Sequence, residues 1–224
     1  MEVASSTQGE GSPGAVALDL LVHVRDHLLL ALTALAVALA VGLPAGVWAA
    51  RSVQARTAAL GALNAARVVP SLAVLALMIP LVGVGFRPAV IALALLAIPP
   101  IAINVDLALR GVPAAWIEAA RGLGMTPRQI QLRVEWPLAL PMAFAGIRTA
   151  AVEVIASATL AAFIGGGGLG EPIVNGLADN DMGALLEGAI SVALLALGAE
   201  IALGWIERRL ALRASLGDLR RDAA

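Results

Sequence analysis

Long runs of apolar residues, separated by short polar stretches, make up most of this 224-residue chain. A membrane-crossing helix needs about 20 mostly apolar residues, and five runs reach roughly that length. They cover approximately residues 27–50, 57–81, 88–109, 138–164 and 183–206. We therefore predict an all-α, polytopic membrane protein with about five transmembrane helices. Proline and glycine interrupt several runs, which membrane helices tolerate where neighbouring helices satisfy the freed backbone groups.

One polar stretch, residues 118–141, interrupts this pattern and reads EAARGLGMTPRQIQLRVEWPLALP. Just before and within it, apolar residues recur at helical spacing and predict one face of a short helix, namely Trp116, Ala119, Ala120 and Leu123. We expect Gly122 and Gly124 to end that helix. Thr126, Pro127 and Gln129 then carry the signals of a second helix start. We expect Pro137 and Pro141 to end this excursion and restart the membrane helix.

The composition agrees with a membrane protein and excludes several other classes. The chain is 60% hydrophobic and 14% charged, with a mean hydropathy of +0.90. It has no cysteine, so disulfides and thiolate metal sites are excluded. All 15 basic residues are arginine, and a nucleotide-binding P-loop requires a lysine. No basic stripe outside the membrane flanks suggests nucleic acid as a partner.

The arginines predict the orientation of the chain. Eleven of them follow the first run, lie in or near the polar stretch, or follow the last run, and two lie in the connections on the other side. Because arginine in short loops favours the cytoplasmic side, we predict an outside N-terminus. The polar stretch and the C-terminus would then be cytoplasmic.

The polar stretch resembles the EAA motif of ABC-importer permeases, the binding-protein-dependent inner membrane components. Glu118, Ala119, Ala120 and Gly124 match, and Pro137 keeps the spacing at its end, whereas Val134 and Trp136 depart from the usual residues. The resemblance implies a type I ABC importer transmembrane domain with the motif as its coupling helix. The ATPase-coupling residues would be Glu118, Ala119, Ala120, Arg121, Gly122, Gly124 and Met125.

Two further stretches, residues 67–85 and 158–173, resemble permeases that import glycine betaine, carnitine or choline. This resemblance implies a non-catalytic subunit of the bacterial inner membrane that contacts lipid. Its expected partners are an ABC ATPase dimer, an extracytoplasmic substrate-binding protein, and a second copy or a homologous permease. No cofactor is expected in this chain, because ATP and magnesium would bind the partner ATPase. The expected domains are a disordered tail (1–22), the transmembrane domain (23–211) and a cytoplasmic tail (212–224).

Ionisable or kink-forming residues within the apolar runs are candidates for the pathway or a gate. A charged residue inside a membrane costs about 2.5–3.5 kcal/mol on insertion scales and is a functional candidate by default. These candidates are Arg67, Pro70, Ser71, Arg148 and Glu153. Asp106 lies four residues before Arg110, so we expect structural pairing there.

Two other features leave alternatives open. The glycine run at residues 165–170 is either a flexible turn or a close approach to a partner. A quaternary ammonium is typically held by an aromatic cage, yet the chain has no tyrosine, three phenylalanines and four tryptophans. We therefore expect high-affinity recognition on another polypeptide.

Two alternative functions remain. A permease for methionine or another small nutrient would share the topology and the EAA motif, although residues 158–173 argue against it. A stand-alone secondary transporter is the alternative from a different class. Such transporters often contain an internal repeat, and we find none in this sequence.

Overall fold

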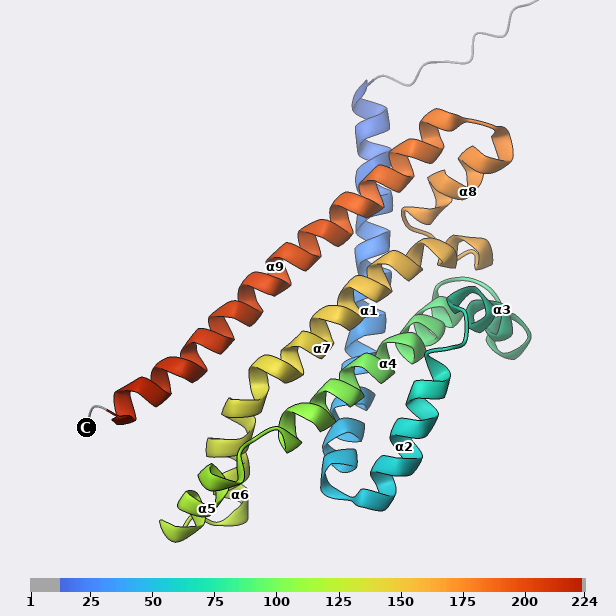
Figure 1. The fold of residues 1–224 in the computed structure, drawn as a ribbon. Coiled ribbons are helices and arrows are strands. Elements are labelled where there is room, and N and C mark those ends of the chain that lie inside the picture. Colours follow the sequence, from blue (N-terminus) through green and yellow to red (C-terminus); the bar gives the residue numbers. More distant parts are fainter. Residues whose placement is uncertain (1–12, 223–224) are drawn as a thin grey trace, which may run out of the picture.

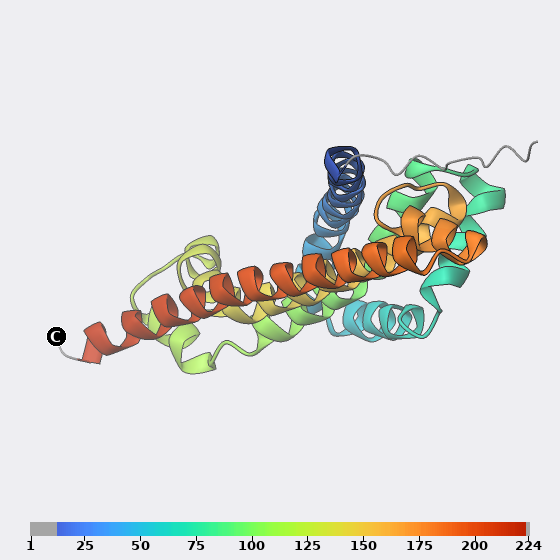
Figure 2. The same ribbon diagram turned by 90° about the horizontal axis from the view of Figure 1, so that it is seen from above.

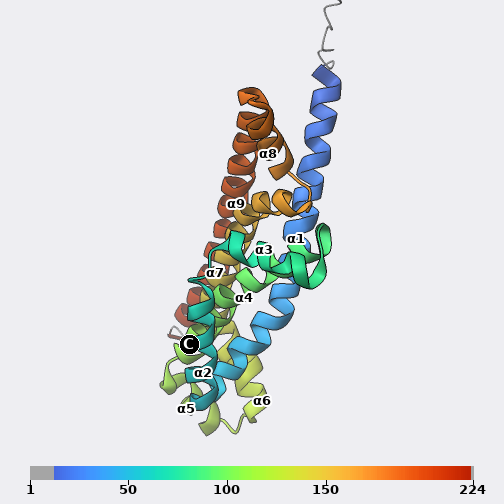
Figure 3. The ribbon, with the colours of Figure 1, turned by 90° about the vertical axis from the view of Figure 1, so that its right-hand side faces the viewer.

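Two antiparallel helices, α4 (Phe86–Arg110) and α7 (Trp136–Ser157), form the centre of the computed structural model (Figure 1). The structure describes residues 13–222. The other long helices are α1 (Pro13–Arg51), which packs on α4, and α9 (Met182–Asp222), which packs on α7. Figure 3 shows α1 and α9 on opposite sides of the central pair.

Shorter helical elements connect these four helices, and no described residue forms a strand. They are α2 (Val53–Ala66), α3 (Ser71–Val82), α5 (Ala114–Gly122), α6 (Pro127–Ile130), a π-helical turn η1 (Gln131–Glu135), a 3-10 helix η2 (Ala158–Ile164) and α8 (Gly170–Asp179). The all-α prediction is therefore confirmed.

Four of the five predicted spans correspond to helices that are long and apolar enough to cross a membrane. They cover Leu18–Arg51, Phe86–Arg110, Pro127–Ile164 and Met182–Leu212. The prediction of one continuous span over residues 57–81 is wrong, because the helix breaks between α2 and α3. Pro70 precedes α3 with an extended ψ of 135°. A proline also disfavours the helical conformation of the residue before it. The break thus follows from the local sequence.

The split pair connects the lower end of α1 to the start of α4. In Figure 1, α2 rises from the end of α1, α3 lies at the right at about mid-height, and α4 runs from there to the lower end. The lower end holds α5, α6, the α1–α2 turn and the C-terminal end of α9, while α8 and η2 lie toward the upper end. The described part of the chain therefore contains four long helices and the split pair α2–α3. Which end faces the cytoplasm stays a prediction.

Small residues allow the helices of the bundle to approach closely. Buried alanines recur along α1, α4 and α7, including Ala34, Ala97 and Ala150. A Cβ added at Gly46 of α1 would lie 2.6 Å from the Ala102 carbonyl oxygen of α4. A Cβ at Gly146 of α7 would lie 2.4 Å from the Cβ of Asn104. Such contacts are typical of membrane helices, which associate through packing rather than through exclusion of water.

Helix α9 packs differently from the three inner helices. Figure 2 shows it crossing over the molecule as one long, nearly straight rod. Its main contacts are with α7 and α8, and large apolar side chains such as Leu194 and Ile201 are more than 60% exposed. A side chain of this kind is suited to lipid or to another membrane subunit.

The terminal helices reach into the segments that were predicted as tails. Helix α1 begins at Pro13, within the predicted tail 1–22, and α9 continues to Asp222 in the predicted tail 212–224. Residues 1–12 and 223–224 of these predicted tails lie outside the described part of the chain. The boundary between the transmembrane domain and its tails stays a prediction.

Candidate functional site

Helix α5 at the lower end of the bundle carries most of the EAA-like residues. Ala120 is buried and Ile117 is half-buried, whereas Ala119 is exposed. Leu123, immediately after the helix, is 83% exposed. Of the predicted apolar face, Ala120 is therefore buried within this chain, whereas Ala119 and Leu123 are exposed. Helix α5 packs through Ile117 and Ala120, three residues apart, which turns Ala119 outward and leaves Leu123 beyond the helix end.

A left-handed glycine ends α5, as the sequence predicted for Gly124. Its φ is +75°, the Met125 N–H donates to the Ala120 carbonyl, and the Gly124 N–H donates to the Arg121 carbonyl. These two bonds define a Schellman motif. Gly122 is different, because it lies within the helix and a Cβ there would meet nothing within 4 Å. Gly124 is therefore required for its left-handed backbone conformation, whereas Gly122 is an exposed position with open space around it.

The second short helix starts as predicted. The Thr126 hydroxyl accepts from the Gln129 N–H at 3.4 Å, and the Gln129 side chain accepts from the Thr126 N–H at 2.8 Å. With Pro127 at the first helical position, this is a complete capping box.

Pro137 lies at the start of α7, as expected, whereas the expectation for Pro141 is wrong. Helix α6 continues through the π-turn η1 into α7, and Pro141 lies inside α7. Within η1, the Trp136 N–H donates to the Gln131 carbonyl five residues earlier. Because Pro137 has no N–H and its ring clashes with a carbonyl four residues earlier in an α-helix, the wider π-turn accommodates it without ending the helix.

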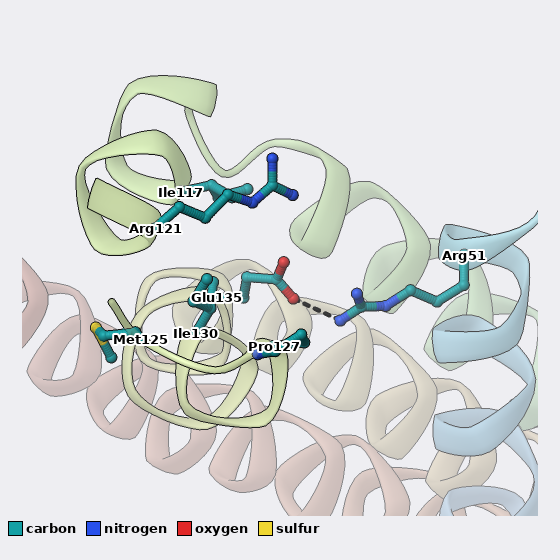
Figure 4. Close-up of a pocket in the computed structure, with 7 residues that line it drawn as sticks. All are labelled: Arg51, Ile117, Arg121, Met125, Pro127, Ile130 and Glu135. Carbon is teal, nitrogen blue, oxygen red and sulfur yellow. Dashed lines mark hydrogen bonds and ion pairs between the residues drawn. The ribbon is translucent and has the colours of Figure 1, made fainter. Parts of the chain in front are cut away.

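A groove of about 350 Å³ separates α5 from the start of α7 (Figure 4). Its lining residues are Arg51, Ile117, Arg121, Met125, Pro127, Ile130 and Glu135. Arg51, the last residue of α1, donates to Glu135 at 2.5 Å across the groove. The Glu135 side chain is 13% exposed and that of Arg51 is 47% exposed. This bond joins the end of α1 to the start of α7 through two residues that are 84 positions apart in the sequence.

The seven predicted coupling residues are brought together in one loop, but they face different ways. Arg121 and Met125 line the groove, Ala120 is buried, and the other four are exposed, namely Glu118, Ala119, Gly122 and Gly124. Sequence reasoning missed Arg51 and Glu135 as a pair. The only available signal was a charge at the end of the first apolar run and a second charge before Pro137.

Charged groups on α7 and α4 also form ion pairs. Arg148 of α7 donates to Glu200 at 3.0 Å and to Glu207 at 2.7 Å, both on α9. The side chain of Asp106 is fully buried and accepts from Arg110 at 2.6 Å and 3.0 Å. The predicted pairing of Asp106 is confirmed. The ionic contacts of Arg148 link α7 to α9.

The other candidate pathway residues lie at or near the α2–α3 break. Arg67 and Pro70 are exposed there, and Ser71, at the start of α3, is half-buried. Glu153 of α7 is half-buried, and no described side chain forms an ion pair with it, although the charge of Arg67 acts on it. Glu153 is thus a carboxylate within an apolar helix that the described part of the chain leaves without a direct partner.

The glycine run at the upper end makes close contacts within the chain. Gly165, Gly167 and Gly168 have positive φ values of 73°, 79° and 83°. A Cβ on Gly168 would lie 3.0 Å from the Cα of His27 in α1. His27 is fully buried, and its Nε2 donates to the Ile155 carbonyl at 2.9 Å. The run is therefore a packed connection between α1 and the end of α7.

No group of three or more histidine, cysteine or carboxylate side chains that could hold a metal occurs among the described residues. At the lower end, the tip of α5 is exposed, Ala120 of the same helix is buried, and the groove adjoins it. Such an arrangement suits binding to another protein.

The fold is that of an ABC-importer transmembrane domain. A solved structure of the MetNI methionine ABC transporter, in an inward-facing conformation, matches with a TM-score of 0.79 at 24% identity. The match covers 89% of this chain and 99% of that one. An amino acid ABC transporter matches with a TM-score of 0.73 at 19% identity, covering 88% and 96%.

The chain belongs to the family of binding-protein-dependent transport system inner membrane components, whose model matches residues 42–212. The carnitine transport permease OpuCB of Listeria monocytogenes is 45% identical over 88% of this chain and 90% of its own. The choline transport system permease OpuBB of Bacillus subtilis is 40% identical over 86% and 88%. The osmoprotectant import permease OsmW of Salmonella typhimurium is 42% identical over 83% and 86%.

Proposed function

We propose that this chain is the membrane-spanning subunit through which an ATP-driven importer moves quaternary-amine osmoprotectants such as glycine betaine, carnitine or choline. The observation that carries the proposal is its similarity to permeases of such solutes, at 45% and 40% identity over more than four fifths of the chain. The fold alone would fit several nutrients. The chain itself performs no bond chemistry in this proposal.

The exposed tip of α5 is the proposed contact with an ABC ATPase. Leu123 is a large apolar side chain that is 83% exposed on a polar loop. Beside it, Ala119 and Gly122 are exposed and small, so a partner surface can approach the helix closely. Glu118 is exposed on the same helix and offers a charge. An apolar knob with small, polar surroundings is typical of a protein-binding surface.

ATP and magnesium would bind the partner ATPase, which is expected to be a dimer. Each ATPase subunit would then meet one copy of α5, so a second permease copy or a homologous permease is required. The exposed apolar residues of α3 and α9, among them Leu77 and Leu194, offer surface for that neighbour or for lipid. The proposed location is the bacterial inner membrane.

High-affinity recognition of the solute is proposed to lie on an extracytoplasmic binding protein. Trp48 is on α1 near its lower end, and Trp205 of α9 has Arg209 stacked over its ring at 3.8 Å. The Trp205 face is therefore already occupied by a cation from this chain. At the upper end, a hydrogen bond between Gly85 and Ile164 brings the segments of Phe86 and Phe163 together. Two rings make a weaker site than a full cage.

Glu153 and Arg67 are the proposed contacts of the solute on its way through the membrane. A half-buried carboxylate without a direct partner can attract a quaternary ammonium group, and the nearby guanidinium can attract the carboxylate of a betaine. Pro70 and Ser71 would shape this part of the pathway, because the helix break lies there. Arg148 is bonded to two carboxylates of α9, so its proposed role is to hold α7 and α9 in position rather than to contact the solute.

Competition for uptake tests the proposed substrate class. Cells that lack other osmoprotectant importers would carry this chain with its ATPase and binding protein, and uptake of labelled glycine betaine would be measured. Unlabelled carnitine or choline should reduce the uptake, whereas methionine should not. Uptake of labelled methionine, with no uptake of any quaternary amine, would contradict the proposal and favour the small-nutrient alternative.

A further inference from the structure

Glu135 lies between two arginines and is bonded to only one of them. Its Oε2 accepts from Arg51 of α1 at 2.5 Å. Figure 4 shows the other carboxylate oxygen directed toward the opposite wall of the groove, where Arg121 of α5 extends its guanidinium. Arg121 has no ion pair with any described carboxylate. The groove thus holds one carboxylate and two cations, with one possible contact not made.

The position of Glu135 in the chain gives these contacts mechanical importance. It is the last residue of the π-turn η1, directly before α7. Single π-turns are frequent at functional sites, and this one links the α5–α6 loop to the central membrane helix. Arg51 is the last residue of α1. A force on α5 can therefore reach both α1 and α7 through one carboxylate.

The groove leaves room for α5 to move. Its volume of about 350 Å³ separates Arg121 from Glu135, and the adjoining walls include the apolar side chains Ile117 and Ile130. Ile130 is already buried, so closing the groove would cover the half-buried Ile117 further and bring Arg121 onto the unbonded oxygen of Glu135. A carboxylate can accept from two arginines at once because it offers two oxygens. The open and closed groove would then be two discrete arrangements of the same residues.

We propose that Glu135 is a positioning residue that transmits the movement of α5 to the membrane helices. With the groove open, Glu135 is held by Arg51 alone. When the partner bound to α5 pushes it inward, Arg121 joins the same carboxylate, and α5, α1 and α7 then move as one body. This inference rests on the proposed function, because it requires an ATPase that pushes on α5.

Cross-linking tests the two arrangements directly, and it is practical because the native chain has no cysteine. In the complete transporter, the pair Arg51→Cys and Glu135→Cys should cross-link without nucleotide. The pair Arg121→Cys and Glu135→Cys should cross-link several times faster with ATP and vanadate than without nucleotide. The pair Arg51→Cys and Glu135→Cys does not include α5, so it serves as the control, and its rate should not change with nucleotide.

A functional measurement separates transmission from simple stabilisation. Glu135→Gln should keep the melting temperature and the ATPase association of the wild type. Its solute uptake per ATP hydrolysed should fall about five-fold or more. Arg133→Ala, with an exposed side chain in the same π-turn, should keep the wild-type ratio.

The outcomes distinguish the two claims. A wild-type complex that does not hydrolyse ATP would overturn the proposed function. An active complex in which the Arg121→Cys and Glu135→Cys pair cross-links equally with and without nucleotide would overturn the inference alone. The inference would also be overturned if Glu135→Gln kept a normal uptake per ATP hydrolysed. The same holds if this variant lowered the melting temperature and the uptake together while the ATP hydrolysed per uptake event stayed constant.

Discussion

Ala119 and Ala120 have the same side chain and adjacent positions, yet α5 turns one outward and buries the other. The sequence predicted both on one contact surface, because both fit a helical spacing with Trp116. Which of two neighbouring alanines is buried depends on how the helix is rolled against η1 and α6. That roll is fixed by Ile117 and Ile130 from different elements, and a single-helix pattern contains no information on it.

The alanine pair gives a matched test of the docking surface. Ala119→Trp should leave the melting temperature unchanged but strongly reduce ATPase association, because the new side chain occupies the exposed face. Ala120→Trp should destabilise the loop, since overpacking a filled site costs about 1–3 kcal/mol. Thermal unfolding and co-purification of the ATPase measure the two effects. Normal ATPase association of Ala119→Trp would contradict docking at this face.

Gly167 and Gly168 differ in packing while sharing a left-handed backbone. Gly167→Ala should cost about 1–2 kcal/mol, the penalty of a side chain in this conformation. Gly168→Ala should cost more, because its Cβ would also lie 3.0 Å from the Cα of His27. The difference between the two free energies of unfolding measures how tightly the glycine run packs on α1. Equal costs would show that the run is a loose turn.

At the scale of elements, helix type was predictable and helix continuity was not. The long apolar runs correctly predicted α1, α4, α7 and α9, and the capping signals at Thr126 correctly predicted α6. The run over residues 57–81 contains Arg67 and Pro70, and these two residues lie in the break that the structure shows. Conversely, Pro137 suggested a break where a π-turn preserves the helix. A proline predicts a local disturbance, and its neighbours decide whether the helix ends.

The contact between α7 and α9 depends on Arg148 as its main ionic link. Arg148→Met would leave Glu200 and Glu207 facing each other without a cation, and two unpaired carboxylates in an apolar setting are unfavourable. We expect a lower melting temperature and easier proteolysis of α9. Adding Glu200→Gln and Glu207→Gln should recover much of the loss. Arg209→Met, on the exposed side of α9, is the control and should have little effect.

The Arg148 prediction fails under a specific result. If Arg148→Met melts like the control, or if removing the two carboxylates gives no recovery, the ionic link does not hold α9. Helix α9 would then be held by its apolar contacts with α7 and α8 alone.

At the scale of the whole molecule, the arginine distribution predicts the side of the membrane that each end faces. The structure places the arginine-rich α1–α2 turn, α5, α6 and the C-terminal end of α9 at one end, and α8 at the other. Arginine bias in short loops predicts that the first end is cytoplasmic. Arg128→Cys should therefore react with an impermeant maleimide only in opened cells. Asn175→Cys, exposed on α8, should react in intact spheroplasts.

The reverse labelling pattern would overturn the orientation. It would also remove the proposed ATPase contact, because α5 would then lie outside the cell. Labelling of both sites in intact spheroplasts would indicate damaged membranes, so a cytoplasmic protein with a reactive cysteine serves as the control for integrity.

The energy source of transport tests the central claim most directly. The complex purified through this chain would be placed in proteoliposomes with binding protein on the α8 side and labelled glycine betaine as solute. Uptake should require ATP on the α5 side, and it should stop when ATP is omitted or the binding protein is left out. Uptake by this chain alone, driven by an ion gradient without ATP, would contradict the account and identify a secondary transporter.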